Sequence, residues 1–117
     1  CMKPIFAFIL MGAQYDPEKD QAHFETESKH TYIYTVQNWE QAKDRVQDLY
    51  QKGCGAIEVC GAFGPEKTRE LIDLTEGKVA IGYVTHFAEQ DALFTAFFGK
   101  KPQDMLCCPQ EISTGCG

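Results

Sequence analysis

Cys60 and two histidines are the residues of this sequence with the chemistry of a nucleophile and its base. Cys60 ends the short apolar stretch AIEVC, and it is followed by the turn GAFG and by Pro65, which favours the start of a helix. A helix N-terminus and a nearby imidazole both stabilise a thiolate, so Cys60 is a candidate nucleophile with His86 or His23 as its base. The alternative is a small apolar residue at the end of a buried strand, which is the commoner role of a single cysteine.

Glu58 is a third candidate catalytic residue, beside Cys60 and His86. It lies in the middle of AIEVC, where a strand buried on both faces should be apolar. A carboxylate at such a position must be paired, protonated or directed toward a cavity or an interface. The alternative is that this strand has one exposed face.

These residues need a scaffold, and the hydrophobic pattern predicts four strands that each precede a helix. Strands are expected at residues 5–11, 31–36, 56–60 and 79–84, which are apolar or rich in β-branched and aromatic residues. Helices are expected at residues 16–24, 38–53, 64–77 and 89–98. Asp16 and Asn38 are the expected N-caps of the first two helices, and Gln41 is placed to complete a capping box with Asn38.

Alternating strands and helices predict a single α/β domain over residues 2–99, an open sandwich of about four mainly parallel strands in the order 2-1-3-4. A ferredoxin-like α+β sheet is the alternative if residues 16–24 form a loop. Residues 100–117 lose the periodicity and are expected to form an extended tail that contains Cys107, Cys108 and Cys116. Cys1 precedes Met2 and is interpreted as a remnant of cloning.

An open parallel sheet binds ligands beyond the carboxyl ends of its strands. The turns after the first, third and fourth strands would therefore share one edge with Cys60 and His86. The glycine turn and the helix N-terminus after Cys60 favour an anion, although a tight turn that begins a helix is the alternative explanation. The candidate ligand-binding residues are Gly12, Gln14, Asp16, His23, Gly61, Ala62, Phe63, Gly64 and Thr85.

Composition and charge exclude several function classes. The chain has 117 residues and a formal net charge of −6, with no cluster of basic residues, so neither a nucleic acid nor an anionic membrane surface is an expected partner. The longest apolar run, PIFAFILMGA, is too short to span a bilayer and has no signal-peptide pattern, so the expected location is the cytoplasm. No cofactor is expected, and no metal, because no cysteine and histidine spacing matches a recognised metal site.

The last predicted helix has apolar residues around more of its circumference than one buried stripe requires. Leu93, Phe94, Phe97 and Phe98 cannot all lie on one narrow face. We therefore expect a homo-oligomer with this helix in the interface. The alternative is that the tail folds back and covers the phenylalanines.

Two segments, FILMGAQYDPEKD and GAIEVCGAFGPEKTRELIDLTEGKVAIGYVT, resemble a family of short prokaryotic α/β proteins catalogued only as a domain of unknown function, number six-five-zero-six. Members have a strand, APGADPE and a helix, followed by AIELCGGFG, another helix and G.VPVG. Ala62 departs from the pattern, because the family often has glycine there. The resemblance covers residues 2–87, leaves out the last helix and the tail, and implies the α/β architecture and the edge at Cys60 but no activity. The matching residues are Gly12, Ala13, Asp16, Pro17, Glu18, Ala56, Ile57, Glu58, Cys60, Gly61, Phe63, Gly64, Gly77, Val79 and Gly82.

The sequence thus predicts a small cytosolic α/β protein that binds a small anionic molecule at the strand edge near Cys60. One alternative is a small enzyme with Cys60 as nucleophile and His86 or His23 as base. Another is a homo-oligomeric interaction module without a small-molecule site.

Overall fold

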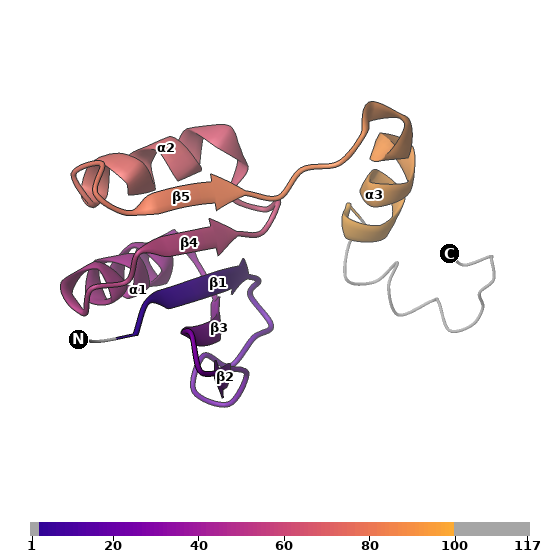
Figure 1. The fold of residues 1–117 in the computed structure, drawn as a ribbon. Coiled ribbons are helices and arrows are strands. Elements are labelled where there is room, and N and C mark those ends of the chain that lie inside the picture. Colours follow the sequence, from indigo (N-terminus) through magenta and orange to yellow (C-terminus); the bar gives the residue numbers. More distant parts are fainter. Residues whose placement is uncertain (1–2, 100–117) are drawn as a thin grey trace. The chain divides into compact units, whose positions relative to one another are not determined.

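The computed structural model describes residues 3–99 (Figure 1). The chain divides into two compact units, with the boundary between Thr85 and His86. The first unit contains a sheet and two long helices. In the second unit, a short 3-10 helix, η1 (Ala88–Gln90), runs directly into α3 (Asp91–Phe98).

The sheet has five strands in the order β2-β3-β1-β4-β5. Four of them, β1, β3, β4 and β5, are parallel, and β2 pairs antiparallel with β3 at one edge. This confirms the predicted α/β class, and the parallel strands have the predicted order 2-1-3-4. It also excludes the ferredoxin-like alternative, in which neighbouring strands would be antiparallel. The strands are β1 (Ile5–Met11), β2 (Ala22–Glu25), β3 (His30–Val36), β4 (Ala56–Val59) and β5 (Ala80–Tyr83).

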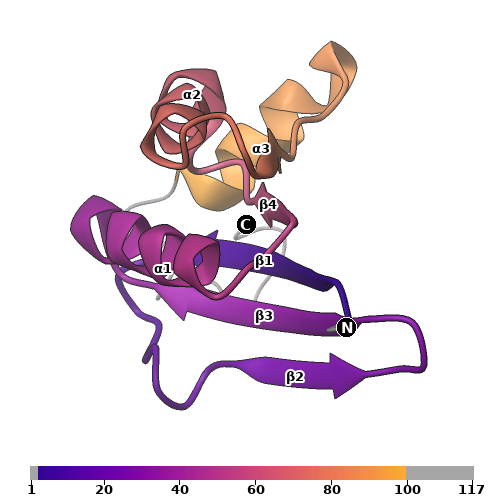
Figure 2. The ribbon, with the colours of Figure 1, turned by 60° about the vertical axis from the view of Figure 1, so that its left-hand side comes forward.

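The two long helices, α1 (Trp39–Gln51) and α2 (Gly64–Leu74), cover the same face of the sheet (Figure 2). The connections from β3 to β4 and from β4 to β5 step across the sheet in the same direction. Because such crossovers are right-handed, both place their helix on one face. The core lies between these layers, where residues of the sheet such as Ile9 and Ile57 and residues of the helices such as Val46 and Leu71 are fully buried.

The opposite face of the sheet carries the alternate residues of each strand. On β1, Ala7 and Ile9 point into the core, so Phe6, Phe8 and Leu10 point the other way. We call this side the open face, because both helices that the structure describes within residues 3–85 lie on the other side. The register places Glu58 beside Phe8 on the open face, and Glu58 is exposed. The position of Glu58 is therefore explained by the second interpretation, in which β4 has one exposed face.

The predicted helix at residues 16–24 is wrong. Residues 17–20 form a single turn, in which the backbone N–H of Asp20 donates to the Asp16 carbonyl at 2.8 Å, and β2 follows from Ala22. The physical reason lies in the pattern of apolar residues. Ala22 and Phe24 have the two-residue spacing of a strand, and the stretch from Glu18 to Gln21 has no apolar residue that could anchor a helix.

The predicted start of α1 is confirmed in detail. The Asn38 side chain accepts a hydrogen bond from the Gln41 N–H at 2.9 Å, and the Gln41 side chain accepts one from the Gln37 N–H at 2.7 Å. After the helix, Gly53 has a φ of +90°, and the Cys54 N–H reaches back to the Leu49 carbonyl at 2.9 Å. A left-handed glycine of this kind ends a helix by satisfying its last carbonyl groups.

The second unit presents much of its apolar surface to solvent. Leu93, Phe97 and Phe98 of α3 are 67%, 68% and 73% exposed. The His86 ring stacks on the Phe94 ring with centroids 4.0 Å apart, and His86 Nε2 lies 3.0 Å from an Asp91 carboxylate oxygen. Among residues 3–99, no helix is both long and apolar enough to cross a membrane.

Candidate functional site

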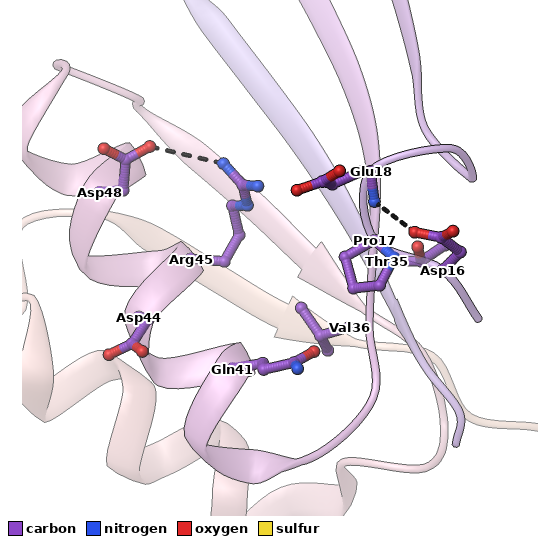
Figure 3. Close-up of a pocket in the computed structure, with 9 residues that line it drawn as sticks. All are labelled: Asp16, Pro17, Glu18, Thr35, Val36, Gln41, Asp44, Arg45 and Asp48. Carbon is purple, nitrogen blue, oxygen red and sulfur yellow. Dashed lines mark hydrogen bonds and ion pairs between the residues drawn. The ribbon is translucent and has the colours of Figure 1, made fainter. Parts of the chain in front are cut away.

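A hollow of about 460 Å³ lies between α1 and the loop that follows β1 (Figure 3). The last two residues of β3 form part of its wall, so it opens at the carboxyl end of a strand next to the central strand β1. This is the edge of the sheet where the sequence predicts ligand binding, and Asp16 belongs to both sets. The hollow is lined by Asp16, Pro17, Glu18, Thr35, Val36, Gln41, Asp44, Arg45 and Asp48.

One side of the hollow is a polar stripe along α1. Gln41, Asp44, Arg45 and Asp48 follow the spacing i, i+3, i+4 and i+7, which places them on one side of a helix. The buried residues of α1 are displaced from them by one position each, so the stripe borders the core. The same packing that buries the apolar face of α1 therefore holds these side chains along the hollow.

The other side is the single turn that replaces the predicted helix. The Asp16 carboxylate accepts a hydrogen bond from the Glu18 N–H at 3.0 Å, and the Asp16 N–H donates to the Asp20 carboxylate at 2.8 Å. The turn is joined to β3 because the hydroxyl of Thr35, which is 4% exposed, donates to the Asp20 carbonyl at 2.8 Å. These contacts hold the carboxylates of the turn opposite α1.

The loop makes a close approach to its own backbone at Gly12. The Gly12 N–H donates to the Val36 carbonyl at 2.9 Å and continues the pairing of β1 with β3. A Cβ atom at residue 12 would lie 3.0 Å from Cε2 of the Tyr15 ring, which is tighter than ordinary packing. The Tyr15 carbonyl in turn accepts a hydrogen bond from the Gln37 side chain at 2.8 Å. Gly12 thus allows the loop to turn closely over the end of β1. Gln14 is exposed in this turn.

Arg45 is the one basic residue that lines the hollow. Its guanidinium lies 4.0 Å from the centre of the Tyr34 ring, and Nη1 is 3.5 Å from an Asp48 carboxylate oxygen. Figure 3 shows the side chain reaching from α1 toward Glu18, on the far side of the hollow. Burial raises the pKa of Tyr34, with a smaller opposing effect from the Arg45 charge, so the ring beneath Arg45 is a neutral phenol.

Four carboxylates and one guanidinium therefore surround the hollow. The charges of the lining do not balance: Lys52 Nζ lies 3.2 Å from an Asp48 carboxylate oxygen and offsets part of the excess, and the remaining negative charge favours a positive group. A guanidinium has five N–H donors, and the contact with Asp48 uses one of them. The site can accept hydrogen bonds from an ammonium group at several points and can donate to one acidic group.

The cysteine at the predicted site lies between the ends of β1 and β4. The Cys60 N–H donates to the Ile9 carbonyl at 3.0 Å, and Cys60 Sγ accepts a hydrogen bond from the Met11 N–H at 3.4 Å. Cys60 is half-buried and packs against the core. Both interactions help to join two neighbouring strands, so the thiol has a structural partner in this conformation.

The glycine turn after Cys60 is largely exposed, apart from its aromatic residue. Gly61 and Ala62 are exposed, whereas Phe63 is 3% exposed and packs edge to face against Trp39. Gly64 begins α2 with a φ of +70°, a conformation that favours glycine. Phe63 thus anchors the turn in the core and leaves the preceding backbone at the surface.

The two candidate bases, His23 and His86, belong to different units. His23 is in the edge strand β2, where its Nε2 lies 3.0 Å from His30 Nδ1 and its ring stacks on Tyr32. Two strands, β3 and β1, separate β2 from β4, which corresponds to about 14 Å at the usual strand spacing. The structure therefore does not bring His23 to Cys60. Thr85 is the last residue of the first unit, and His86 belongs to the second unit with Asp91 and Phe94.

Cys54 is the second thiol among the described residues, and it is buried. Its Sγ lies 3.4 Å from the Ile5 carbonyl and 3.3 Å from the Ala56 carbonyl. Burial raises the pKa of this thiol above its ordinary value, so it stays protonated. Within residues 3–99, no group of three or more histidine, cysteine or acidic residues could hold a metal ion. Cys107, Cys108 and Cys116 lie outside the described residues.

Sequence reasoning missed the contribution of α1 to the hollow. The signal was present, since Gln41, Asp44, Arg45 and Asp48 form a polar stripe beside the apolar one. Such a stripe usually faces solvent, however, and nothing local in the sequence shows that a loop 23 or more residues earlier lies against it.

The family pattern agrees with this fold and includes both the loop after β1 and the glycine turn after Cys60. The family model matches residues 5–99 and describes a family of unknown function, DUF6506. The chain belongs to this family. The match corrects the narrower limits expected from the motifs alone, because it continues through α3. No curated protein and no solved structure matched the chain.

Proposed function

We propose that this protein binds a small amine-bearing molecule in the hollow between α1 and the loop after β1. The observation that carries the proposal is the lining, in which four carboxylates and one guanidinium surround about 460 Å³ of space. Pockets for small ligands have volumes of roughly 300–1,000 Å³. The hollow is at the lower end of this range, so its occupant is compact.

The charge of the lining favours an amine over the anion expected from the sequence. An ammonium group in the hollow would have Asp16 and Glu18 on one side and Asp44 and Asp48 on the other. An anion would meet the same four carboxylates with Arg45 as its single basic partner. The anion site expected at the turn from Cys60 to Gly64 stays a prediction, supported by the N-terminus of α2, where Pro65 itself supplies no N–H donor.

Arg45 narrows the class of ligand. Its planar guanidinium suits a carboxylate, and stacking on Tyr34 limits the orientations that it can adopt. A molecule with an amine at one end and a carboxylate at the other satisfies both parts of the lining. Because the lining has more carboxylates than guanidinium groups, a second amine on the ligand is favoured as well. The preferred ligand is therefore an amino acid or a similar zwitterion with an additional amine.

Calorimetry and thermal unfolding with L-lysine, putrescine and succinate as probes test the proposal. L-lysine has both groups, putrescine only amines, and succinate only carboxylates, so affinity should fall in that order. At a ligand concentration of ten times Kd, binding contributes about 1.4 kcal/mol, which raises the Tm of a domain of this size by about 5–10 °C.

Two variants locate the binding. Asp44→Asn removes one carboxylate from the exposed side of the hollow and should weaken L-lysine binding several-fold. Asp73→Asn removes the same charge from the exposed surface of α2 and is the matched control. Succinate binding more tightly than putrescine would contradict the proposal. Equal effects of the two variants would contradict the location, because they would indicate a response to net charge alone.

A further inference from the structure

The open face of the sheet carries an apolar patch that the proposed ligand site does not use. Phe6, Phe8 and Leu10 of β1 form its centre, Ile33 of β3 pairs with Phe8, and Phe24 lies on β2. Phe6 and Phe24 lie on either side of Thr31, so the five apolar side chains are on the same face of three adjacent strands, with Thr31 between Phe24 and Phe6. Phe24 is 54% exposed, and the other four are half-buried.

This composition is unusual for a sheet face in water. Parallel sheets are normally covered on both faces, and the sheets with one wet face carry polar residues there. Among the described strand residues, Glu58 is the one charged side chain that the register places on the open face. It lies on β4, to one side of the apolar centre on β1 and β3.

We infer that the open face is the contact surface for a second copy of this chain. Neighbouring strands lie about 4.8 Å apart and rise about 3.3 Å per residue, so five strands of this length present roughly 400 Å² in projection. Side chains on a pleated sheet expose more area than this projection. Two copies face to face therefore bury roughly 1,000 Å², the size at which specific interfaces begin.

The area of the open face favours a second copy of the chain over a single helix as its partner. A helix of eight residues, the length of α3, is about 12 Å long and roughly 10 Å wide, and it covers roughly 120 Å². That is less than a third of the face. An identical sheet has the required width, and a two-fold pair brings the same apolar centre together from both sides. Glu58 lies on β4 within this face and next to Phe8, so the pair has to place its carboxylate at the rim or opposite a polar group of the second copy.

Light scattering and sedimentation of the full chain, over a wide range of protein concentration, test this inference with three variants. Phe8→Glu places a charge at the centre of the face and should weaken the dimer by at least about tenfold. Phe24→Lys does the same at the exposed edge, where little of the fold depends on the side chain. Phe97→Glu on α3 is the matched control, since Phe97 is 68% exposed in the other unit.

The expected result is a dimer that both sheet variants dissociate and that the α3 variant leaves intact. Circular dichroism shows whether the Phe8→Glu variant is folded. If that variant is unfolded, Phe24→Lys still tests whether the open face forms the dimer contact. A wild-type chain that is monomeric at every concentration overturns the inference. So does a dimer that only Phe97→Glu dissociates, because the interface would then be the helix expected from the sequence. The variants leave the lining of the hollow unchanged, so ligand binding is tested independently.

Discussion

Replacing Thr35 by valine tests whether one hydrogen bond holds the loop that completes the hollow. The Thr35 hydroxyl is the donor to the Asp20 carbonyl at 2.8 Å, and the residue is 4% exposed, so water cannot easily replace the bond. Valine has nearly the same shape and removes only the donor. The lost hydrogen bond should lower the free energy of unfolding by about 1 kcal/mol.

The same variant should change ligand binding, because the turn from Asp16 to Asp20 carries two of the four carboxylates of the hollow. Freed from β3, the turn has to be ordered when a ligand binds, and the affinity for L-lysine should fall several-fold. Urea unfolding measures the stability, and calorimetry measures the affinity.

Thr31→Val is the control for this prediction. Thr31 lies on the same strand and the same side as Thr35, between Phe6 and Phe24 on the open face. Valine is favourable in a strand, so this change should leave stability unchanged or raise it slightly, with no effect on ligand affinity. If Thr35→Val and Thr31→Val have equal effects on both measurements, the loop is not held by the Thr35 hydroxyl and the reasoning is refuted.

Two further predictions concern titrating groups. Cys54 is buried with a raised pKa, so in the native protein it should alkylate far more slowly than an unfolded thiol, as mass spectrometry can show, and rapid native alkylation would contradict the described core. In the same experiment, selective reaction of Cys60 would favour the enzyme alternative, and resistance until unfolding would remove its nucleophile. A hydrogen bond from Lys3, at 2.6 Å, and then the Lys3 charge lower the pKa of Glu25 from 4.5. Because the pKa is lower in the folded chain, the ionised Glu25 stabilises the fold fully at a pH above the pKa of the unfolded chain. This contribution is lost as the pH falls through the pKa of the folded chain. Carbon NMR should therefore find Glu25 titrating below 4.5 in the native chain and shifting upward in Lys3→Met, whereas an unchanged value would exclude the ion pair in solution.

Much of the scaffold could be predicted because its signals are local. The stretch TYIYTV has the β-branched and aromatic residues of a strand, and it lies within β3. Asn38 and Gln41 specify the start of α1 by hydrogen bonds between residues three and four positions apart. The order of the parallel strands followed from the alternation of strands and helices, because right-handed crossovers leave few arrangements of a small sheet.

The prediction of a helix at residues 16–24 failed because its local sequence is compatible with two conformations. Asp16 and Pro17 form a good helix start, and the first turn does form. The conformation of the next residues is decided by β3, because Ala22 and Phe24 gain backbone hydrogen bonds from a strand that comes later in the chain. The sequence alone does not show that this edge of β3 is free to pair.

The sequence by itself determined the class of fold and the positions of most strands and helices. Those properties depend on periodicity, capping and chain direction, which can be identified from residues close together in the sequence. Only the tertiary structure decided that Arg45 reaches from α1 toward Glu18 and that both long helices leave one side of the sheet open (Figure 3). Contacts of this kind join residues that are far apart in the chain, so they exist only when packing of the core has placed the elements against one another.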